Sequence, residues 1–263
     1  MYLSHLLINV GDNPDRPRPG RLWLRNLYRV HQRLCMAFPD ANRKEQDPAF
    51  LAPFRREDFP LVGQDKTEKG LDRHVHVPRA DKNGFLFRID PIPGGSPLIT
   101  VQSACPPDWD YAFHNAQYLL RAKPQPMPYN PRFEPHQRLR FRLRANPTRR
   151  ARKSSRHPSG HPVEPKWIGK RIPVLPDALQ DWLARRGTEG SFQVAALTSV
   201  LPGYVYFNKT GQPGGGQRLF SVLFEGVLEL TDPEAFVNTL QTGIGPGKAY
   251  GFGLLSVAPV TGG

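Results

Sequence analysis

A tyrosine and a histidine with the spacing needed for acid–base chemistry lie near the start of the chain. Tyr28 and His31 are three residues apart in a segment, residues 21–38, whose apolar residues recur with a helical period. On a helix, this spacing places both side chains on one face. Histidine exchanges protons near pH 7, and a tyrosine hydroxyl beside it can orient a substrate hydroxyl or share the proton transfer. The pair is a candidate catalytic site, and a packed histidine without a catalytic role remains the alternative.

The same predicted helix carries a stripe of arginines. Arg21, Arg25, Arg29 and Arg33 follow one another at intervals of four residues. Like charges at this spacing repel by a few tenths of a kcal/mol per pair. A bound anion would relieve the repulsion, so Arg25, Arg29 and Arg33 are candidate ligands for phosphate.

A second set of arginines lies on a predicted strand, residues 138–145 with the sequence RLRFRLRA. Because strand side chains alternate between two faces, one face is apolar and the other carries four arginines: Arg138, Arg140, Arg142 and Arg144. Such a row is unfavourable unless acids or phosphates lie opposite. Pairing with Glu225 or Glu229 on a neighbouring strand is the alternative to phosphate binding.

The excess positive charge is concentrated around that strand. Residues 121–171 hold fifteen Lys and Arg against two acids, and the rest of the 36 basic and 23 acidic residues balance at 21 each. The candidates that follow the strand are Arg149, Arg150, Arg152 and Lys153. A concentrated positive field suits a polyanion such as a nucleic acid. A solvated basic loop without a ligand is the alternative.

A glycine-rich segment, GIGPGKAYGFGLL at residues 243–255, contains Gly243, Gly245, Gly247, Gly251 and Gly253. Such a run allows a backbone to approach a phosphate closely, with Lys248 as a candidate ligand. It is not a Walker loop, because Ala249 follows the lysine and a helix precedes the segment. A connection required for tight packing is the alternative.

These residues need a scaffold of strands and helices. The periodicities predict strands at residues 2–10, 84–90, 98–103, 138–145, 204–208, 218–230 and 250–257. They predict helices at 21–38, at 176–186 and from Pro233, with Asp232 as N-cap, while 108–121 is read as a short helix and a strand. Both halves fit a βαββαβ order, so we expect an α+β chain of two tandem ferredoxin-like, RNA-recognition-type domains.

A proline-rich stretch predicts the boundary between the two domains. Residues 123–136 contain five prolines, which predicts an extended linker at 123–137 between domains at 1–122 and 138–263. Residues 42–83 are polar and aperiodic and are expected to form a long excursion.

The composition argues against several classes of protein. The chain has 263 residues, 38% of them hydrophobic, and no apolar run near the roughly 20 residues that a membrane helix requires. The first residues lack a basic leader, and the two cysteines, Cys35 and Cys105, cannot form a disulfide framework. We therefore expect a cytoplasmic protein with no membrane partner. No Cys pair or acidic cluster has ligand spacing, so we expect no metal and no cofactor.

Five segments together resemble the CasE family. They are MYLSHLLINV (1–10), NLYRVHQRL (26–34), RLRFRLRANP (138–147), LFEGVLELTDP (223–233) and GIGPGKAYGFGLL (243–255). They occur in this order across nearly the whole chain, and their combination is far more specific than any single segment. CasE proteins are the endoribonucleases that process CRISPR repeats in type I-E systems.

The resemblance implies tandem ferredoxin-like domains, metal-independent cleavage of precursor crRNA on the 3′ side of the repeat hairpin, and retention of the crRNA with the other Cascade subunits. It implies catalytic roles for Tyr28 and His31, and a family lysine corresponds to Lys209. The products would be a 2′,3′-cyclic phosphate and a 5′-OH. Residues 42–83 look long for the family, and residues 149–167 are unusually basic.

Two other function classes stay open. A non-catalytic subunit that holds a hairpin RNA would share the basic face but would not cut the strand. A DNA-binding regulator has less support, because no helix-turn-helix pair with a readable recognition helix is evident.

Overall fold

The computed structural model describes residues 1–11, 19–39, 84–156, 161–208 and 215–260. The predicted excursion at 42–83 lies wholly outside these residues, and so does Lys209. The chain forms two compact units. The first comprises residues 1–85 and 89–129, and the second comprises residues 86–88 and 130–263. The division after residue 129 falls inside the predicted linker.

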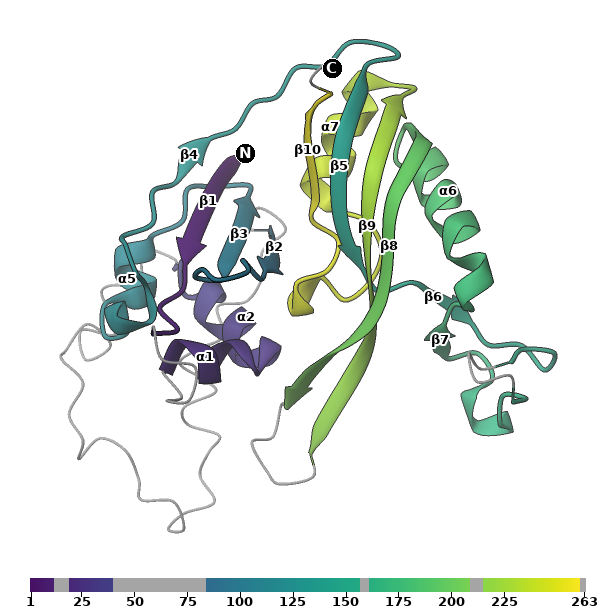
Figure 1. Cartoon of the computed structure of the whole chain (residues 1–263), viewed down its shortest axis with the longest axis horizontal. Helices are drawn as coiled ribbons and strands as arrows, with labels where there is room; N and C mark the ends of the chain where they lie inside the picture. The colour runs from purple at the N-terminus through teal and green to yellow at the C-terminus, as the bar shows by residue number, and fades with distance from the viewer. Residues whose placement is uncertain (12–18, 40–83, 157–160, 209–214, 261–263) are drawn as a thin grey trace. The chain divides into compact units, whose positions relative to one another are not determined.

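The first unit contains a four-stranded sheet. Its strands are β1 (Tyr2–Leu7), β2 (Phe85–Asp90), β3 (Leu98–Ser103) and β4 (Met127–Pro128), in the order β2-β3-β1-β4 (Figure 1). β1 pairs antiparallel with both β3 and β4, so the first strand of the chain lies inside the sheet.

The last strand of this sheet is not where the sequence predicts it. Residues 108–121 form the helix α5 (Trp109–Phe113) and a 3-10 turn, η4 (Gln117–Leu119). The edge strand is the short β4 in the proline-rich stretch. Prolines are compatible with an edge, where one side of the strand needs no hydrogen-bond donor.

The predicted helix over residues 21–38 is two helices, α1 (Pro19–Leu24) and α2 (Leu27–Cys35). Between them Asn26 is extended (φ −120°), and its side-chain oxygen accepts a hydrogen bond from Tyr28 N at 3.2 Å. Asn26 is therefore the N-cap of α2. The break also separates Arg21 from Arg29, so the predicted arginine stripe is not continuous.

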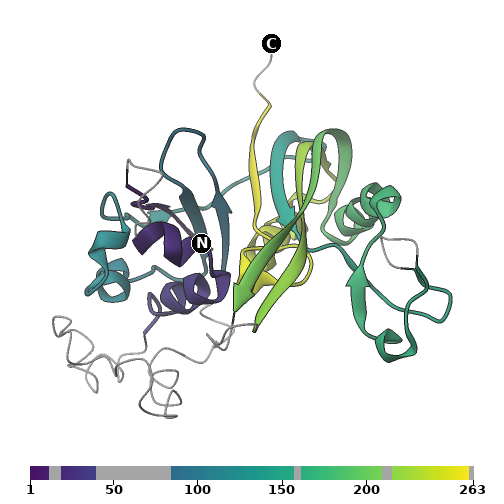
Figure 2. The same cartoon turned by 60° about the horizontal axis from the view of Figure 1, so that its bottom comes forward.

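The second unit is built on a longer sheet. It contains β5 (Arg138–Ala145), β8 (Phe192–Asn208), β9 (Gly216–Leu230) and β10 (Leu255–Pro259), in the order β10-β5-β9-β8. All three neighbouring pairs are antiparallel. β8 and β9 form the long hairpin that Figures 1 and 2 show projecting past the shorter strands of their own sheet.

β8 is much longer than the predicted strand at 204–208. Two register irregularities, between Val194 and Ala196 and between Leu197 and Ser199, interrupt its side-chain alternation. Pro202 and Gly203 follow within the strand. The period of two that identifies a strand is therefore weak in the half that precedes Tyr204.

Two helices, α6 (Leu179–Glu189) and α7 (Pro233–Thr242), cover one face of this sheet. A short turn, η6 (Pro176–Ala178), leads into α6. Asp232 is the N-cap of α7, as predicted, and its side chain accepts from Ala235 N at 3.1 Å. Trp182 of α6, Phe236 of α7 and Phe224 of β9 are among the buried side chains of one core.

The basic segment after β5 folds into a small structure of its own. β6 (Thr148–Arg150) pairs antiparallel with β7 (Arg171–Pro173), and a short turn, η5 (Pro165–Trp167), lies between them. Ala151, Val163 and Ile172 form a separate buried cluster beneath it. The last two elements of the unit are the turn η7 (Lys248–Tyr250) and β10.

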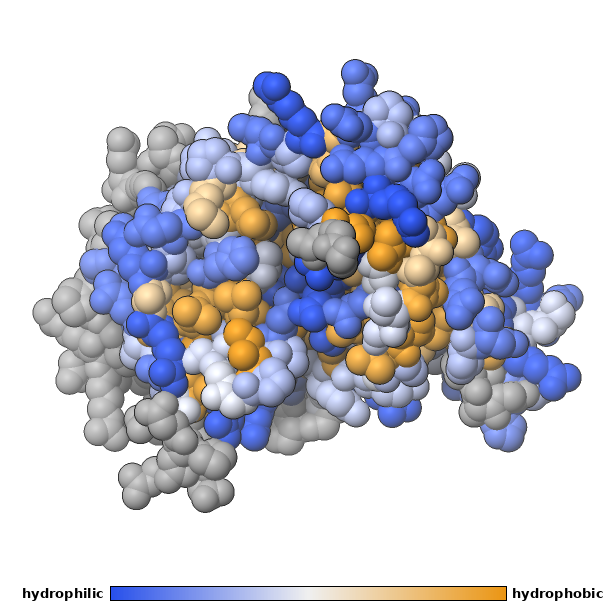
Figure 3. Space-filling model, turned by 45° about the horizontal axis from the view of Figure 1, so that its top comes forward, coloured by the Kyte–Doolittle hydropathy of each residue, from blue (hydrophilic) through white to orange (hydrophobic). Residues whose placement is uncertain are grey.

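Figure 3 shows one face of the surface, where hydrophilic side chains surround smaller apolar patches. None of the helices in the described residues is long and apolar enough to cross a membrane.

Candidate active site and nucleic-acid interface

The structure places Tyr28 and His31 on α2, in the first two turns after the Asn26 cap. Positions three apart on a helix are neighbours on its surface, so the two side chains share a face, as predicted. The Tyr28 side chain is half-buried, whereas only 9% of His31 is exposed. Capping fixes the first turn of α2 and with it the backbone that carries both residues.

Two neighbours define the surroundings of the His31 ring. Phe85 stacks on it with ring centroids 5.6 Å apart and an interplanar angle of 29°. The Sγ atom of Cys35, one turn along α2, lies 3.5 Å from His31 Nε2 and 3.9 Å from Nδ1. Cys35 is buried, and its sulfur lies close to both ring nitrogens. The ring is thus held in a fixed orientation.

The arginines of this helix have different environments. Arg25 and Arg29 are exposed. Arg33 is half-buried, and its Nη1 donates to the carbonyl of Ala112 at 2.9 Å and to Asn115 Oδ1 at 3.2 Å. Burial lowers the pKa of the Arg33 guanidinium. Arg33 therefore joins α2 to the α5 region, and its role as a phosphate ligand stays a prediction.

The arginine face of β5 exists, because Arg138, Arg140 and Arg142 are exposed and the intervening side chains are buried. Cross-strand pairing, the alternative to phosphate binding, occurs at Arg142, whose Nε donates to Glu225 Oε1 at 2.6 Å. Arg138 lies opposite Glu229 in the strand register. Acids on β9 thus offset part of this positive charge.

The other two arginines of β5 face uncharged positions. Arg144 is half-buried, and its Nη1 donates to Ser221 Oγ at 3.4 Å. Arg140 lies opposite Val227 on β9 and Ala258 on β10. The arginine most available to an outside anion on this strand is therefore Arg140.

The insertion between β5 and α6 presents its cations outward, with one exception. Arg150, Arg152 and Lys153 are exposed. Arg149 instead donates from Nη1 to Ser155 Oγ at 2.7 Å and from Nη2 to the Arg156 carbonyl at 2.9 Å. Arg149 stabilises the loop that displays its neighbours.

The glycine-rich segment matches the packing alternative better than a phosphate loop. All five of its predicted glycines have positive φ. A Cβ on Gly243 would lie 2.7 Å from Leu86 Cδ1, and one on Gly253 would lie 2.8 Å from the Ile244 carbonyl. The space in front of these glycines is filled by the protein itself. Lys248 is half-exposed in the short turn η7.

Replacing Gly253 by alanine should destabilise the fold. Its φ is +90°, and its carbonyl accepts from Ile244 N at 2.9 Å while its N–H donates to the Arg144 carbonyl at 2.8 Å. We expect Gly253→Ala to lower the free energy of unfolding by about 1–3 kcal/mol, measured by urea denaturation. Gly203→Ala is the control, because nothing lies within 4 Å of its added Cβ. Equal effects of the two changes would contradict the packing interpretation.

Sequence reasoning missed one cation. Arg88 of β2 is only 5% exposed, and its Nη1 donates to Ser256 Oγ at 2.8 Å. The available signal was a single arginine within the apolar strand sequence FLFRID. Across the described residues, no three His, Cys, Asp or Glu side chains form a group that could hold a metal ion.

Comparison with known proteins gives a consistent result. A family model described as CRISPR associated protein matches residues 72–259. The CRISPR-associated endoribonuclease Cse3 of Thermus thermophilus is 36% identical over 197 residues, which cover 70% of this chain and 85% of that protein. The CRISPR system Cascade subunit CasE of Escherichia coli K12 is 28% identical over 264 residues, which cover 99% and 100%.

Comparison of the fold with solved structures agrees with these sequence matches. The structure of Thermus thermophilus Cse3 bound to an RNA representing a pre-cleavage complex aligns with a TM-score of 0.64 at 29% identity, over 98% of each chain. Its α+β architecture is that of the present chain. The family model spans more than half of the sequence, and the Cse3 relative exceeds 30% identity over most of it. This chain therefore belongs to the CasE family of CRISPR-associated proteins.

Proposed function

We propose that this chain is an endoribonuclease that binds the repeat hairpin of a precursor crRNA, cleaves it on the 3′ side of the hairpin and keeps the product within a Cascade complex. The observation that carries the proposal is the pair Tyr28 and His31 on one face of a capped helix, in a chain 36% identical to an endoribonuclease. Relatives named as a Cascade subunit and solved with RNA support the substrate and the partners.

In the proposed reaction, the 2′-OH before the scissile phosphate attacks phosphorus. The O2′–P bond forms, the P–O5′ bond breaks, and the products are a 2′,3′-cyclic phosphate and a 5′-OH. His31 and Tyr28 carry the proton removed from O2′ and the proton delivered to O5′. The nucleophile belongs to the RNA, so the reaction requires neither a metal-bound water nor a covalent enzyme intermediate. We assign Lys209 to the charge that develops on the phosphorane.

The phosphate backbone of the hairpin requires cations outside the reacting centre. We assign this role to Arg25 and Arg29 in the first unit and to Arg150, Arg152 and Lys153 in the second. Each of these side chains is exposed in its own unit. Exposed guanidinium and ammonium groups bind phosphate with release of counterions from the RNA.

We further infer that each unit is a ferredoxin-like domain. The predicted linker at residues 123–137 includes β4 of the first sheet, so the connection between the two domains begins after that strand. Numbered within each unit, both sheets have the strand order 4-1-3-2, which follows from β2-β3-β1-β4 and from β10-β5-β9-β8. This is the order of the βαββαβ fold. RNA-recognition modules use the same arrangement of strands.

The function is tested by incubating the purified chain with end-labelled repeat RNA in EDTA. We expect one cut at the 3′ side of the hairpin, with ends identified as a 2′,3′-cyclic phosphate and a 5′-OH. A requirement for added Mg²⁺ would rule out the proposed reaction. A 3′-OH product would do the same, because it cannot arise from attack by the neighbouring 2′-OH.

A specific observation favours one other candidate, a subunit that binds the hairpin without cutting it. His31 is 9% exposed and enclosed by Phe85 and Cys35, which suits a packed histidine. The same incubation distinguishes the two functions. Tight, salt-sensitive binding without strand scission is the expected result for this candidate.

A further inference from the structure

The insertion between β5 and α6 carries an exposed tryptophan that the proposed cleavage does not use. Trp167, the last residue of η5, is 37% exposed, and Ile168 beside it is 41% exposed. The small core of the insertion is formed instead by Ala151, Val163 and Ile172. Burying an indole ring would remove more apolar surface from water than burying any of these three side chains. The largest apolar side chain of the insertion therefore lies at its surface.

Backbone hydrogen bonds fix the turn that presents this ring. Trp167 N donates to the Glu164 carbonyl at 2.9 Å, and the Trp167 carbonyl accepts from Lys170 N at 2.9 Å. The residue after β6, Ala151, pairs with the same turn. Its N donates to the Lys170 carbonyl at 2.8 Å, and its carbonyl accepts from Gly169 N at 2.9 Å. The ring is thus attached to an ordered backbone, and ordered groups lose less entropy when they bind a ligand.

The segment that carries the ring is strongly basic. Residues 148–173 contain eight Lys and Arg residues against one acid. Arg150 and Arg152, on either side of the residue that pairs with the turn, are exposed. Lys170 Nζ lies 5.4 Å from the centroid of the Trp167 ring. Such a concentration of positive charge favours a polyanionic ligand.

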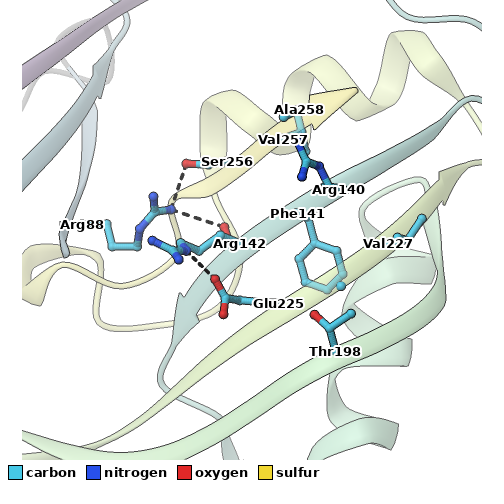
Figure 4. A pocket seen from close by; sticks show the side chains of 11 residues that line it. Arg88, Arg140, Phe141, Arg142, Thr198, Glu225, Val227, Ser256, Val257 and Ala258 are labelled. Atoms are coloured by element: carbon cyan, nitrogen blue, oxygen red, sulfur yellow. Dashed lines mark hydrogen bonds and ion pairs between the residues drawn. The ribbon is translucent and has the colours of Figure 1, made fainter. Parts of the chain in front are cut away.

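The row of arginines on β5 differs from this segment. Acids of β9 lie opposite Arg138 and Arg142 in the strand register. Figure 4 shows the Arg142 side chain directed toward Glu225, and the two are joined at 2.6 Å. The one acid of the insertion, Glu164, lies 2.6 Å from Lys166 Nζ. Formal charge is therefore less balanced in the insertion than along β5 and β9.

An exposed aromatic ring among exposed cations is the combination that proteins use to bind single-stranded nucleic acids. An unpaired base stacks on such a ring, whereas the bases of a stem are already stacked on one another. Exposed guanidinium and ammonium groups bind the phosphates on either side of that base. The insertion therefore suits an unpaired nucleotide better than a paired one.

We propose that Trp167 is a stacking subsite for one unpaired base of the repeat RNA, with Lys170, Arg150 and Arg152 binding the adjacent phosphates. Two parts of the RNA offer this chemistry, the loop of the hairpin and the single strand that flanks the stem. The proposal rests on the proposed function, because it takes the ligand to be the same RNA. It adds a contact with a base to the phosphate contacts already assigned to the insertion.

The test measures dissociation constants for three RNAs by filter binding at one salt concentration. They are the intact repeat with its flanks, the same RNA with abasic loop nucleotides, and the same RNA with abasic flank nucleotides. For the intact RNA, Trp167→Ala should weaken binding about 10-fold, and Trp167→Phe, which keeps a ring, should lose less. One abasic RNA should bind the wild-type chain and Trp167→Ala equally, and it identifies which part of the RNA supplies the base.

Ile168→Ala is the matched control, because it removes the adjacent and similarly exposed apolar side chain, which has no ring. It should leave the affinity for each RNA nearly unchanged. Thermal melting of each variant verifies that it is folded. Three results would overturn the subsite: unchanged binding of the intact RNA by Trp167→Ala, a loss that persists on both abasic RNAs, or an equal loss in Ile168→Ala. These are binding measurements, so they are independent of whether the chain cleaves RNA in EDTA.

Discussion

His31→Ala is expected to lower the rate of hairpin cleavage by about 10²–10⁴-fold, the range that positioned acid–base groups contribute. Imidazole is the side chain that most often transfers protons in catalysis, and the variant removes it from the proposed reacting centre. Hairpin affinity should change little, because the exposed cations remain. Single-turnover cleavage in EDTA and a separate filter-binding titration measure the two effects.

Stability must be controlled, because the His31 ring packs against Phe85 and Cys35. His31→Gln preserves most of the volume and a hydrogen-bonding group, so it should remain folded and still lose activity. Tyr28→Phe keeps the half-buried ring and removes only the hydroxyl, and we expect a smaller loss of about 10–100-fold. Undiminished cleavage in both histidine variants would exclude His31 from the reaction.

Raising the salt concentration from 50 to 200 mM is expected to weaken hairpin binding by about 10³-fold or more. This is the loss observed when about six or more phosphates are contacted, because bound cations release counterions from the nucleic acid. The positive excess that predicts it lies within residues 121–171. The slope of log affinity against log salt, measured by filter binding, gives the number of contacts. A slope near zero would contradict phosphate binding.

Charge-matched double variants locate those contacts. Arg150→Gln with Arg152→Gln removes two exposed cations of the insertion, and it should reduce the magnitude of the slope by about 1–2. Arg132→Gln with Arg185→Gln removes two exposed cations elsewhere on the second unit and should leave the slope unchanged. If the two double variants gave equal slopes of log affinity against log salt concentration, net charge rather than the insertion would determine binding.

The sequence was sufficient wherever local periodicity and capping decide the structure. β5 has the predicted bounds, because its arginines and apolar residues alternate without interruption. α7 begins at Pro233 behind the Asp232 cap, and β3 matches its prediction at both ends. The combination of short motifs was specific enough to indicate the family that the comparisons then showed.

Tertiary contacts decided what each cation does. Arg33 and Arg29 look equivalent on a helical stripe, yet Arg33 binds Ala112 and Asn115, about eighty positions later in the chain. Arg149 is bonded within its loop while Arg150 is exposed. No local pattern encodes such partners, because they are set by how distant segments pack.

The packing of distant segments also accounts for the remaining differences between the predicted and the observed elements. β8 extends back to Phe192 because β9 supplies a continuous partner, although bulges weaken its own alternation. Composition determined that this chain is suited to a polyanion. Tertiary structure determined which side chains remain available to bind one, since burial and hydrogen bonding remove the others.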